Sequence, residues 1–295
     1  MINPCRALLV EAFTGAPLGG NGAAVVLLEQ PAEASWMQQL AGSLKQSESA
    51  FLWRDEAGQW FLRWFTPSCE VALCGHATLA STLALARWNL LEAGQCIQLG
   101  SRSGALTVSL VENHPGAASI DLPSEPLQPL SPPAELAGLL GGELEGYWAS
   151  ELGYRVALVP PSFKLQQLAN PSEHLPAADR QGLVVMQALS PSTAVMLLEQ
   201  PCDYQLRFFA PGLGLPEDPV TGSAHALVAP WWAQRLGRPT VRGWQPSARS
   251  GGMLCEVLTP TAVRLTGTGH CLWDGTLDAG SAGHDRSGWQ VCRLD

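Results

Sequence analysis

The sequence predicts an α+β protein made of two similar halves, in each of which short strands surround one central apolar helix. The first observation is a strand–loop–helix segment that occurs twice, at residues 64–80 and 209–227. The second is that such helices are apolar on nearly all sides, so other structure has to wrap around them. The third is the content of 30 glycines and 23 prolines in 295 residues, which favours short strands and turns.

The first half begins with two strands and a helix, continues with a hairpin, and ends with three more strands. Pro67 ends the hairpin because its ring removes a ladder donor. Five prolines within residues 123–133 mark a crossover, so we expect domains at 1–122 and 123–295. The expected helices are 34–44 and 77–86, and the expected strands are 7–13, 23–28, 47–53, 60–65, 96–99, 105–111 and 118–122.

The second half repeats this arrangement of strands around one helix. We expect its C-terminal strand, at 288–294, to be a candidate for returning to the first half. The expected helices are 163–168 and 224–236, the latter with Pro230 inside it, and the expected strands are 147–151, 155–159, 182–189, 194–198, 204–209, 253–258, 262–268 and 288–294.

The two helix starts indicate a site. Gly75-His76-Ala77 in the first copy matches Gly222-Ser223-Ala224 in the second, and Thr221 falls where Cys74 falls. Backbone N–H groups at such helix starts can hold an anion. We expect His76 and Ser223 to lie at the starts of two helices that face each other across one cleft. Chance similarity of two strand–loop–helix units is the alternative.

Composition excludes several classes of function. With 26 acidic and 17 basic residues, the formal net charge of −9 disfavours nucleic acid and anionic membrane surfaces as partners. No uncharged apolar run reaches 18 residues, so we expect no membrane span. The first residues lack the basic and apolar regions of a signal peptide, and the eight cysteines include no Cys-x-x-Cys. We therefore expect a cytoplasmic protein with reduced thiols.

Four motifs together resemble the phenazine-biosynthesis PhzF-like family over essentially the whole chain. They are Glu11-Ala12-Phe13-Thr14 with Gly19-Gly20-Asn21, Ser47-Glu48-Ser49-Ala50-Phe51, Cys74-Gly75-His76-Ala77-Thr78, and Glu217-Asp218-Pro219-Val220-Thr221-Gly222-Ser223-Ala224. The resemblance implies the diaminopimelate epimerase fold, in which two pseudo-symmetric β-barrel-like halves are each wrapped around a central helix. It also implies a homodimer and an active site in the cleft between the halves.

The resemblance implies an isomerase without metal or organic cofactor that moves a proton on a small carboxylate-bearing substrate. The family's phenazine-pathway member performs this chemistry on a dihydro-hydroxyanthranilate. Glu48 matches the family's proton shuttle. A carboxylate whose pKa is raised by burial among apolar neighbours can accept and return a proton near neutral pH. The alternative for Glu48 is an exposed glutamate at the start of a strand.

Three further residues match the family's active site. His76 could polarise a substrate oxygen or hold a carboxylate, whereas a lone histidine beside an apolar helix is often structural. Asp218 matches a residue that positions the substrate or the acid–base partner, and its alternative role is helix capping. Ser223 matches a serine that hydrogen-bonds the substrate.

Backbone groups and one arginine complete the expected substrate site. The backbones at Gly75 and Gly222 could bind the substrate carboxylate. Residues 245–252 resemble a family loop near the cleft, where Arg249 is a candidate contact for an anionic substrate. A surface turn is the alternative for this loop.

Cys74 raises the possibility of a cysteine-type epimerase or racemase, in which two cysteines act as opposed acid and base. Its partner position is Thr221, which is a poor base, so this alternative is disfavoured. A zinc site from His76, His225, Asp218 and Glu48 fits by residue type, but no ligand-spacing motif is present. A non-catalytic small-molecule-binding protein is the alternative outside enzymes.

Two departures from the family pattern limit what the resemblance implies. Ala72 stands where many relatives carry Asp or Asn, and Gly22 stands where many carry Pro. The first changes the polarity near the site, so the identity of the substrate does not follow from the fold.

Overall fold

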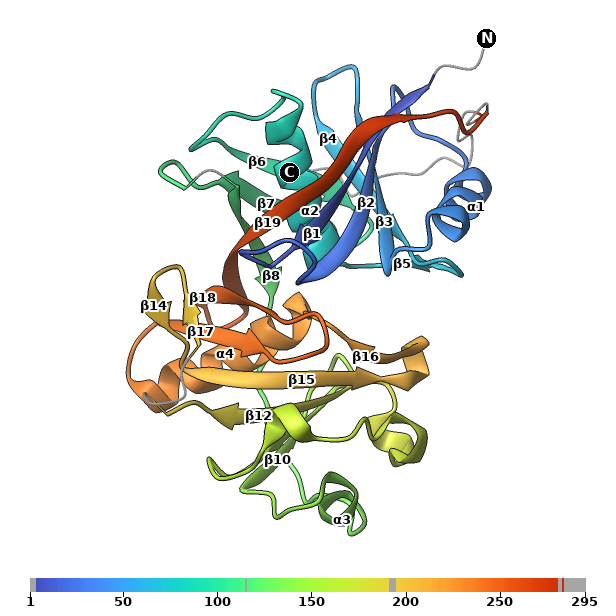
Figure 1. The fold of residues 1–295 in the computed structure, drawn as a ribbon. Helices are drawn as coiled ribbons and strands as arrows, with labels where there is room; N and C mark the ends of the chain where they lie inside the picture. Colours follow the sequence, from blue (N-terminus) through green and yellow to red (C-terminus); the bar gives the residue numbers. More distant parts are fainter. Residues whose placement is uncertain (1–3, 115, 191–194, 281–282, 284–295) are drawn as a thin grey trace. The chain divides into compact units, whose positions relative to one another are not determined.

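The computed structural model describes residues 4–114, 116–190, 195–280 and 283. The chain forms two compact units. Unit 1 contains the residues up to 121 together with those from 266 onward, and unit 2 contains residues 122–265 (Figure 1). The chain leaves unit 1 within strand β8, Ala117–Pro123, and returns to it within strand β19, Ala262–Leu277.

Unit 1 contains two α-helices, parts of strands β8 and β19, and the strands that precede β8 in the sequence. Its other elements are β1 (Cys5–Ala12), β2 (Asn21–Leu27), α1 (Ala34–Leu44), β3 (Glu48–Arg54), β4 (Trp60–Phe65), β5 (Glu70–Val71), α2 (Gly75–Arg87), β6 (Cys96–Ser101) and β7 (Gly104–Leu110).

Unit 2 contains shorter strands and more turns. Its elements are β9 (Gln128–Pro129), α3 (Leu136–Leu140), β10 (Gly146–Ala149), β11 (Arg155–Leu158), β12 (Leu183–Ala188), β13 (Met196–Leu197), β14 (Gln200–Pro201), β15 (Tyr204–Ala210), β16 (Leu215–Asp218), α4 (Gly222–Leu236), β17 (Thr240–Gln245) and β18 (Gly251–Thr259). Single 3₁₀ turns lie at Leu165–Gln167, Ser172–His174, Ala177–Asp179 and Pro211–Leu213.

Eight strands of unit 1 close into a barrel. They follow one another in the order β1, β2, β3, β4, β6, β7, β8 and β19, and β19 pairs back with β1. Helix α2 packs against β1, β2, β3 and β7, and Figure 1 shows it surrounded by these strands. The expectation of a helix wrapped by short strands is confirmed.

The burial of α2 explains its composition. Ten of its 13 residues are buried, and its small side chains let the strands approach closely. Its three buried hydroxyls donate to the carbonyl oxygen four residues earlier: Thr78 to Cys74 at 2.6 Å, Ser81 to Ala77 at 2.7 Å and Thr82 to Thr78 at 2.9 Å. Each buried hydroxyl therefore has a partner within the helix itself or just before it.

The two units repeat one strand topology. In unit 1 the pairs β1–β2, β2–β3, β3–β4, β4–β6 and β6–β7 are antiparallel, parallel, antiparallel, parallel and antiparallel. In unit 2 the pairs β10–β11, β11–β12, β12–β15, β15–β17 and β17–β18 show the same series. Helix α4 packs against β17 and β18. The doubled pattern in the sequence is thus a doubled topology.

Several predicted elements differ from the structure. The helix expected at 163–168 is only the 3₁₀ turn Leu165–Gln167, because Pro160, Pro161 and Pro171 leave little room between them for a longer helix. Strand β17 and helix α3 were not predicted, and β19 is longer than expected. The strand expected at 288–294 lies outside the described residues, as does residue 194 of the strand expected at 194–198.

No helix in the described part of the chain is long and apolar enough to cross a membrane.

Candidate active site

The start of helix α2 places two reactive side chains, those of Cys74 and His76, in the interior of unit 1. Cys74 is the residue before the helix, with an extended backbone, and Gly75 begins the helix. His76 follows and is only 5% exposed. Among the described residues no side chain caps this helix start, so its first N–H groups have no side-chain acceptor there.

Glu48 reaches the same place from strand β3. It is the first residue of that strand, pairs with Ala23 of β2 in parallel register, and is 8% exposed. One carboxylate oxygen, Oε2, lies 3.2 Å from Nε2 of His76. Glu48, the expected proton shuttle, and His76, the candidate for polarising a substrate oxygen or holding a carboxylate, therefore form a buried ion pair. The sequence did not predict that the partner of Glu48 would be His76.

Cys74 also contacts the imidazole ring. Its Sγ is 3.4 Å from Nδ1 of His76. Burial raises the pKa of the Cys74 thiol to about 11, and the Glu48 carboxylate adds to this effect. Burial alone would lower the pKa of His76, but the neighbouring Cys74 and the Glu48 carboxylate outweigh it and raise that pKa well above 6.5. Burial thus favours the neutral thiol, and the Glu48 carboxylate beside the ring favours the imidazolium form of His76.

Ser47 and Asn21 support this cluster, and the sequence named them only as parts of motifs. The Ser47 hydroxyl donates to Oδ1 of Asn21 at 2.7 Å, lies 3.1 Å from the Gly22 carbonyl oxygen, and is 3.5 Å from Nε2 of His76. These contacts link the starts of strands β2 and β3 to the imidazole. They restrict how far the ring can move.

Glu48, Cys74 and His76 also form a potential metal-binding set. One ligand atom from each lies within 4.8 Å of the others, and all three residues are buried. The zinc set considered from the sequence, which also included His225, is not assembled in this way, because His225 is hydrogen-bonded within unit 2. In unit 2, Nδ1 of His225 is 2.9 Å from the Tyr204 hydroxyl, and burial lowers the pKa of His225 to about 3.

The start of helix α4 in unit 2 has a hydrogen-bonded network around one carboxylate, Asp218, in place of the Glu48, Cys74 and His76 cluster. The Thr221 hydroxyl donates to Oδ2 of Asp218 at 2.6 Å, and both residues are buried. The Gln245 amide nitrogen donates to the Asp218 carbonyl oxygen at 2.6 Å, and its amide oxygen accepts from the Thr221 backbone N–H at 2.9 Å. Gln245 therefore fixes the loop that carries Asp218.

Gln245 was missed as a site residue because the sequence did not predict the strand that carries it. It is the last residue of β17, and it begins the loop from which Arg249 was selected. Arg249 itself is exposed, and its backbone N–H donates to Ser247 Oγ at 3.2 Å. A part for the Arg249 side chain in binding remains a prediction.

Ser223 has a neighbour that the sequence did not indicate. Its hydroxyl lies 3.4 Å from the Tyr154 hydroxyl, and neither residue is fully buried. The Tyr154 ring packs on Phe208 of β15 with the ring centres 4.9 Å apart, which holds its hydroxyl near the start of α4. No side chain of the described residues caps α4 at its N-terminus.

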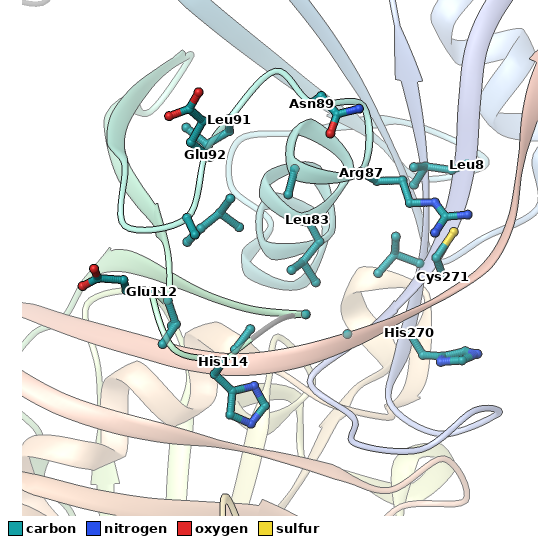
Figure 2. Close-up of a pocket in the computed structure, with 18 residues that line it drawn as sticks. Leu8, Leu83, Arg87, Asn89, Leu91, Glu92, Glu112, His114, His270 and Cys271 are labelled. Atoms are coloured by element: carbon teal, nitrogen blue, oxygen red, sulfur yellow. The ribbon is translucent and has the colours of Figure 1, made fainter.

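A separate cavity of about 750 Å³ lies within unit 1, away from the predicted residues. Figure 2 shows it beside the C-terminal end of α2, where Leu83 and Arg87 project from the helix. His76 lies at the opposite end of the same helix. None of the seven predicted site residues lines this cavity.

Comparisons with known proteins place these features in one family. Residues 10–275 match the family model PhzC-PhzF, described as phenazine biosynthesis-like protein. An uncharacterized isomerase of Halalkalibacterium halodurans is 36% identical, over 88% of this chain and 93% of that protein. One of Pseudomonas aeruginosa is 34% identical, over 91% of this chain and 96% of its own length.

Among solved structures, a phenazine biosynthesis protein of the PhzF family from Enterococcus faecalis is 27% identical with a TM-score of 0.81. The match covers 93% of this chain and 99% of that one. Together with the barrel of unit 1 and the repeated topology, it confirms the fold class that the sequence predicted. The chain belongs to the phenazine biosynthesis-like PhzC-PhzF family and is an isomerase of that family.

Proposed function

We propose that the protein moves a proton on a small carboxylate-bearing substrate without a metal or organic cofactor, with Glu48 as the acid and base. The observation that carries this proposal is the buried pair of Glu48 and His76, whose Oε2 and Nε2 atoms are 3.2 Å apart. Moving a proton between two carbons needs one group that takes it from the first and returns it to the second. The Glu48 carboxylate accepts a proton from the first carbon, can exchange it with the solvent, and donates a proton to the second carbon.

His76 has a complementary role in this mechanism. When a proton leaves carbon, negative charge develops on an adjacent oxygen of the substrate. An imidazolium beside that oxygen would stabilise the charge by donating a hydrogen bond. The raised pKa of His76 supports this role, because it keeps the ring protonated near neutral pH. The chemistry resembles that of the dihydro-hydroxyanthranilate isomerase of the family.

The substrate carboxylate and the remaining polar groups are proposed to meet the residues at the helix starts. The backbones at Gly75 and Gly222 would bind the carboxylate, since neither helix has a side-chain cap among the described residues. Asp218 and Ser223 would hydrogen-bond the substrate, and Arg249 would meet its negative charge. Support for Asp218 is its fixed orientation, which Thr221 and Gln245 impose.

The cysteine-type epimerase is less well supported. A cysteine that removes a proton from carbon has to be a thiolate, and burial raises the pKa of Cys74 to about 11. At the matching position of the other unit stands Thr221, whose hydroxyl donates to Asp218. Neither residue is set up to accept a proton near neutral pH.

A deuterium-exchange screen tests the proposal. The protein is incubated in D₂O with a pool of small carboxylic acids, and the acids are examined by mass spectrometry. Uptake of deuterium at carbon in one of them, absent with the Glu48→Gln variant, is the expected result. Uptake that is equal with both proteins would assign the proton transfer to another residue. A pool in which no acid takes up deuterium would count against isomerisation of this substrate class.

We also propose that the enzyme works in the cytoplasm as a homodimer, as the family resemblance implies. Light scattering at micromolar concentration tests the oligomeric state. A species of about twice the 31.4 kDa chain mass is expected. A 31.4 kDa species alone would exclude the dimer.

A further inference from the structure

We propose that Glu48, Cys74 and His76 bind a thiophilic divalent cation of the zinc type, and that the bound ion inhibits the enzyme. The metal site rests on the geometry of the cluster alone. The inhibition rests in addition on the proposed function, because the ion would occupy the two groups that the reaction uses.

The distances within the cluster are close to those of a zinc site. Around a tetrahedral zinc with the usual bond lengths, neighbouring N, O and S ligand atoms are about 3.4–3.6 Å apart. Nε2 of His76 is 3.2 Å from Oε2 of Glu48 and 3.9 Å from Sγ of Cys74. The three ligand atoms all lie within 4.8 Å of one another. Sγ of Cys74 is nearer Nδ1 of the ring, at 3.4 Å, so its side chain has to rotate toward Oε2 of Glu48 to reach an ion bound at Nε2.

The chemistry of the donors favours zinc over harder cations. A thiolate and an imidazole select zinc and related metals, whereas magnesium and calcium prefer oxygen ligands. One carboxylate completes a set of three protein ligands, and the fourth tetrahedral position stays open to water or a small anion. Cys74 and His76 bind a metal only after losing their protons, which pass to the solvent.

The ion-pair contact marks where the metal would lie. Oε2 of Glu48 is buried, and Nε2 of the His76 ring is 3.2 Å away. A metal ion would take the place of the proton between these two atoms. Ser47, held by Asn21, borders the ring and would support it as a ligand.

Inhibition follows from the overlap of the two sites. With an ion bound, the Glu48 carboxylate no longer accepts a proton from carbon, and His76 no longer has a proton on Nε2 to donate. The same three side chains can therefore serve either a metal-free catalyst or an inactive metal complex. The enzyme would then respond to the concentration of free zinc.

Binding is tested with the full chain and the metal alone. After treatment with a chelator, the protein is titrated with ZnCl₂ by calorimetry, and with CoCl₂ while its absorption spectrum is recorded. We expect one site per chain and the near-ultraviolet and visible bands of tetrahedral cobalt bound to a thiolate. Cys74→Ala should weaken binding at least about tenfold and abolish the thiolate band. Cys69→Ala, which removes an exposed thiol of the same unit, should leave both unchanged.

Two results would overturn the metal site. One is zinc binding that persists in Cys74→Ala and in the conservative Cys74→Ser, with both variants folded by circular dichroism. The other is binding that disappears with Cys69→Ala, which would mark an adventitious ion on surface thiols. Either would remove the cluster as the ligand set.

The activity measurement separates this inference from the proposed function. Deuterium exchange by the metal-free enzyme should fall in proportion to the site occupied by zinc and recover on chelation. Exchange that continues with the site filled would overturn the inhibition and leave the metal site in place. A chain that binds zinc at Cys74 but never exchanges deuterium would contradict the proposed function alone.

Discussion

Units 1 and 2 share a topology, but they place different chemistry at the start of their central helices. Unit 1 has a carboxylate, an imidazole and a thiol within 4.8 Å. Unit 2 has the Asp218 carboxylate, the Thr221 hydroxyl and the Gln245 amide in one hydrogen-bonded network. Aligning the helices and the paired strands matches Cys74 with Thr221, His76 with Ser223, Glu48 with Gly182, and Val71 with Asp218.

What the units retain is as informative as what they change. Arg63 of β4 pairs through two nitrogens with Glu70 of β5, and its guanidinium lies over the Phe65 ring. In unit 2, Arg207 pairs with Glu217 in the same way and lies over Phe209. This arrangement anchors the loop before each central helix. The comparison teaches that the anchored loop is common to both units, whereas the groups on it are specialised.

The largest effect should come from Glu48, which has no carboxylate counterpart in unit 2. Glu48→Gln keeps the size of the side chain but removes its basicity. General acid–base catalysis contributes about 10²–10⁴-fold, so isomerisation and deuterium exchange should fall by at least that factor. The rates of both are measured beside Glu56→Gln, a change at an exposed turn. If the Glu48→Gln variant kept normal turnover, the catalytic contrast between the units would be lost.

The Arg–Glu pairs provide a test of the loop anchor that both units share. Arg207→Met leaves Glu217 without the partner seen in the structure, and breaking a buried pair in this way costs about 3–5 kcal/mol. Arg63→Met should cost less, because Arg102 still lies 2.5 Å from Glu70. Urea unfolding of both variants measures the difference. Equal losses would mean that Arg102, which is half exposed, contributes nothing to the first pair.

Gln245 should show a smaller effect that is confined to unit 2. Gln245→Ala removes the acceptor of the Thr221 N–H and the donor to the Asp218 carbonyl oxygen, which should cost about 1–3 kcal/mol. Its counterpart in unit 1 is Ser101, whose hydroxyl bonds within its own hairpin, to Gly104 and Ser103. Ser101→Ala should therefore be the milder change in urea unfolding, and the reverse order would contradict the role given to Gln245.

Much of the fold and part of the site could be predicted from the sequence. The two predominantly apolar helices required other structure around them, and Glu48 and His76 each stood at the start of an apolar element. Gln245 was harder to find because Gly243 makes its strand resemble a turn. The structure shows why glycine is needed there: an added Cβ would lie 2.3 Å from the His225 ring.

The Arg–Glu pairs did leave a signal in the sequence. Arg63 and Arg207 each interrupt an otherwise apolar stretch of a strand that becomes fully buried. A buried arginine needs a partner, and a glutamate follows within ten residues in both copies. Which strands pair in parallel, and the contact of Glu48 with His76, depend on long-range packing. Spacing along the chain does not encode that information.

The buried histidines of the two helices should respond to pH in opposite directions. Folding raises the pKa of His76 above 6.5, so its contribution to stability is full below pH 6.5 and is lost as pH rises through the folded pKa. Folding lowers the pKa of His225 to about 3, so its contribution is present above pH 6.5 and is lost as pH falls toward 3. Each slope is at most about 1.4 kcal/mol per pH unit.

Urea unfolding of the wild type, His76→Gln and His225→Gln between about pH 4 and 9 measures these slopes. The difference between wild type and His76→Gln should shrink on the alkaline side. The difference between wild type and His225→Gln should shrink on the acidic side. Slopes of the same sign for both histidines would show that the two helix environments are electrostatically alike.

The smallest effect on turnover should come from Cys74, whose counterpart Thr221 shows that this position does not require a thiol. Cys74→Ala should reduce deuterium exchange by less than about tenfold, because the thiol is neutral near pH 7 and the proton is carried by Glu48. The loss that remains reflects the Sγ contact with Nδ1 of His76, which helps to orient the ring. Exchange rates are measured in the presence of a chelator, so that bound metal does not mask the comparison. If Cys74→Ala were inactive and Glu48→Gln active, the proton transfer would have to be assigned to the Cys74 thiol. That result would support the cysteine-type epimerase.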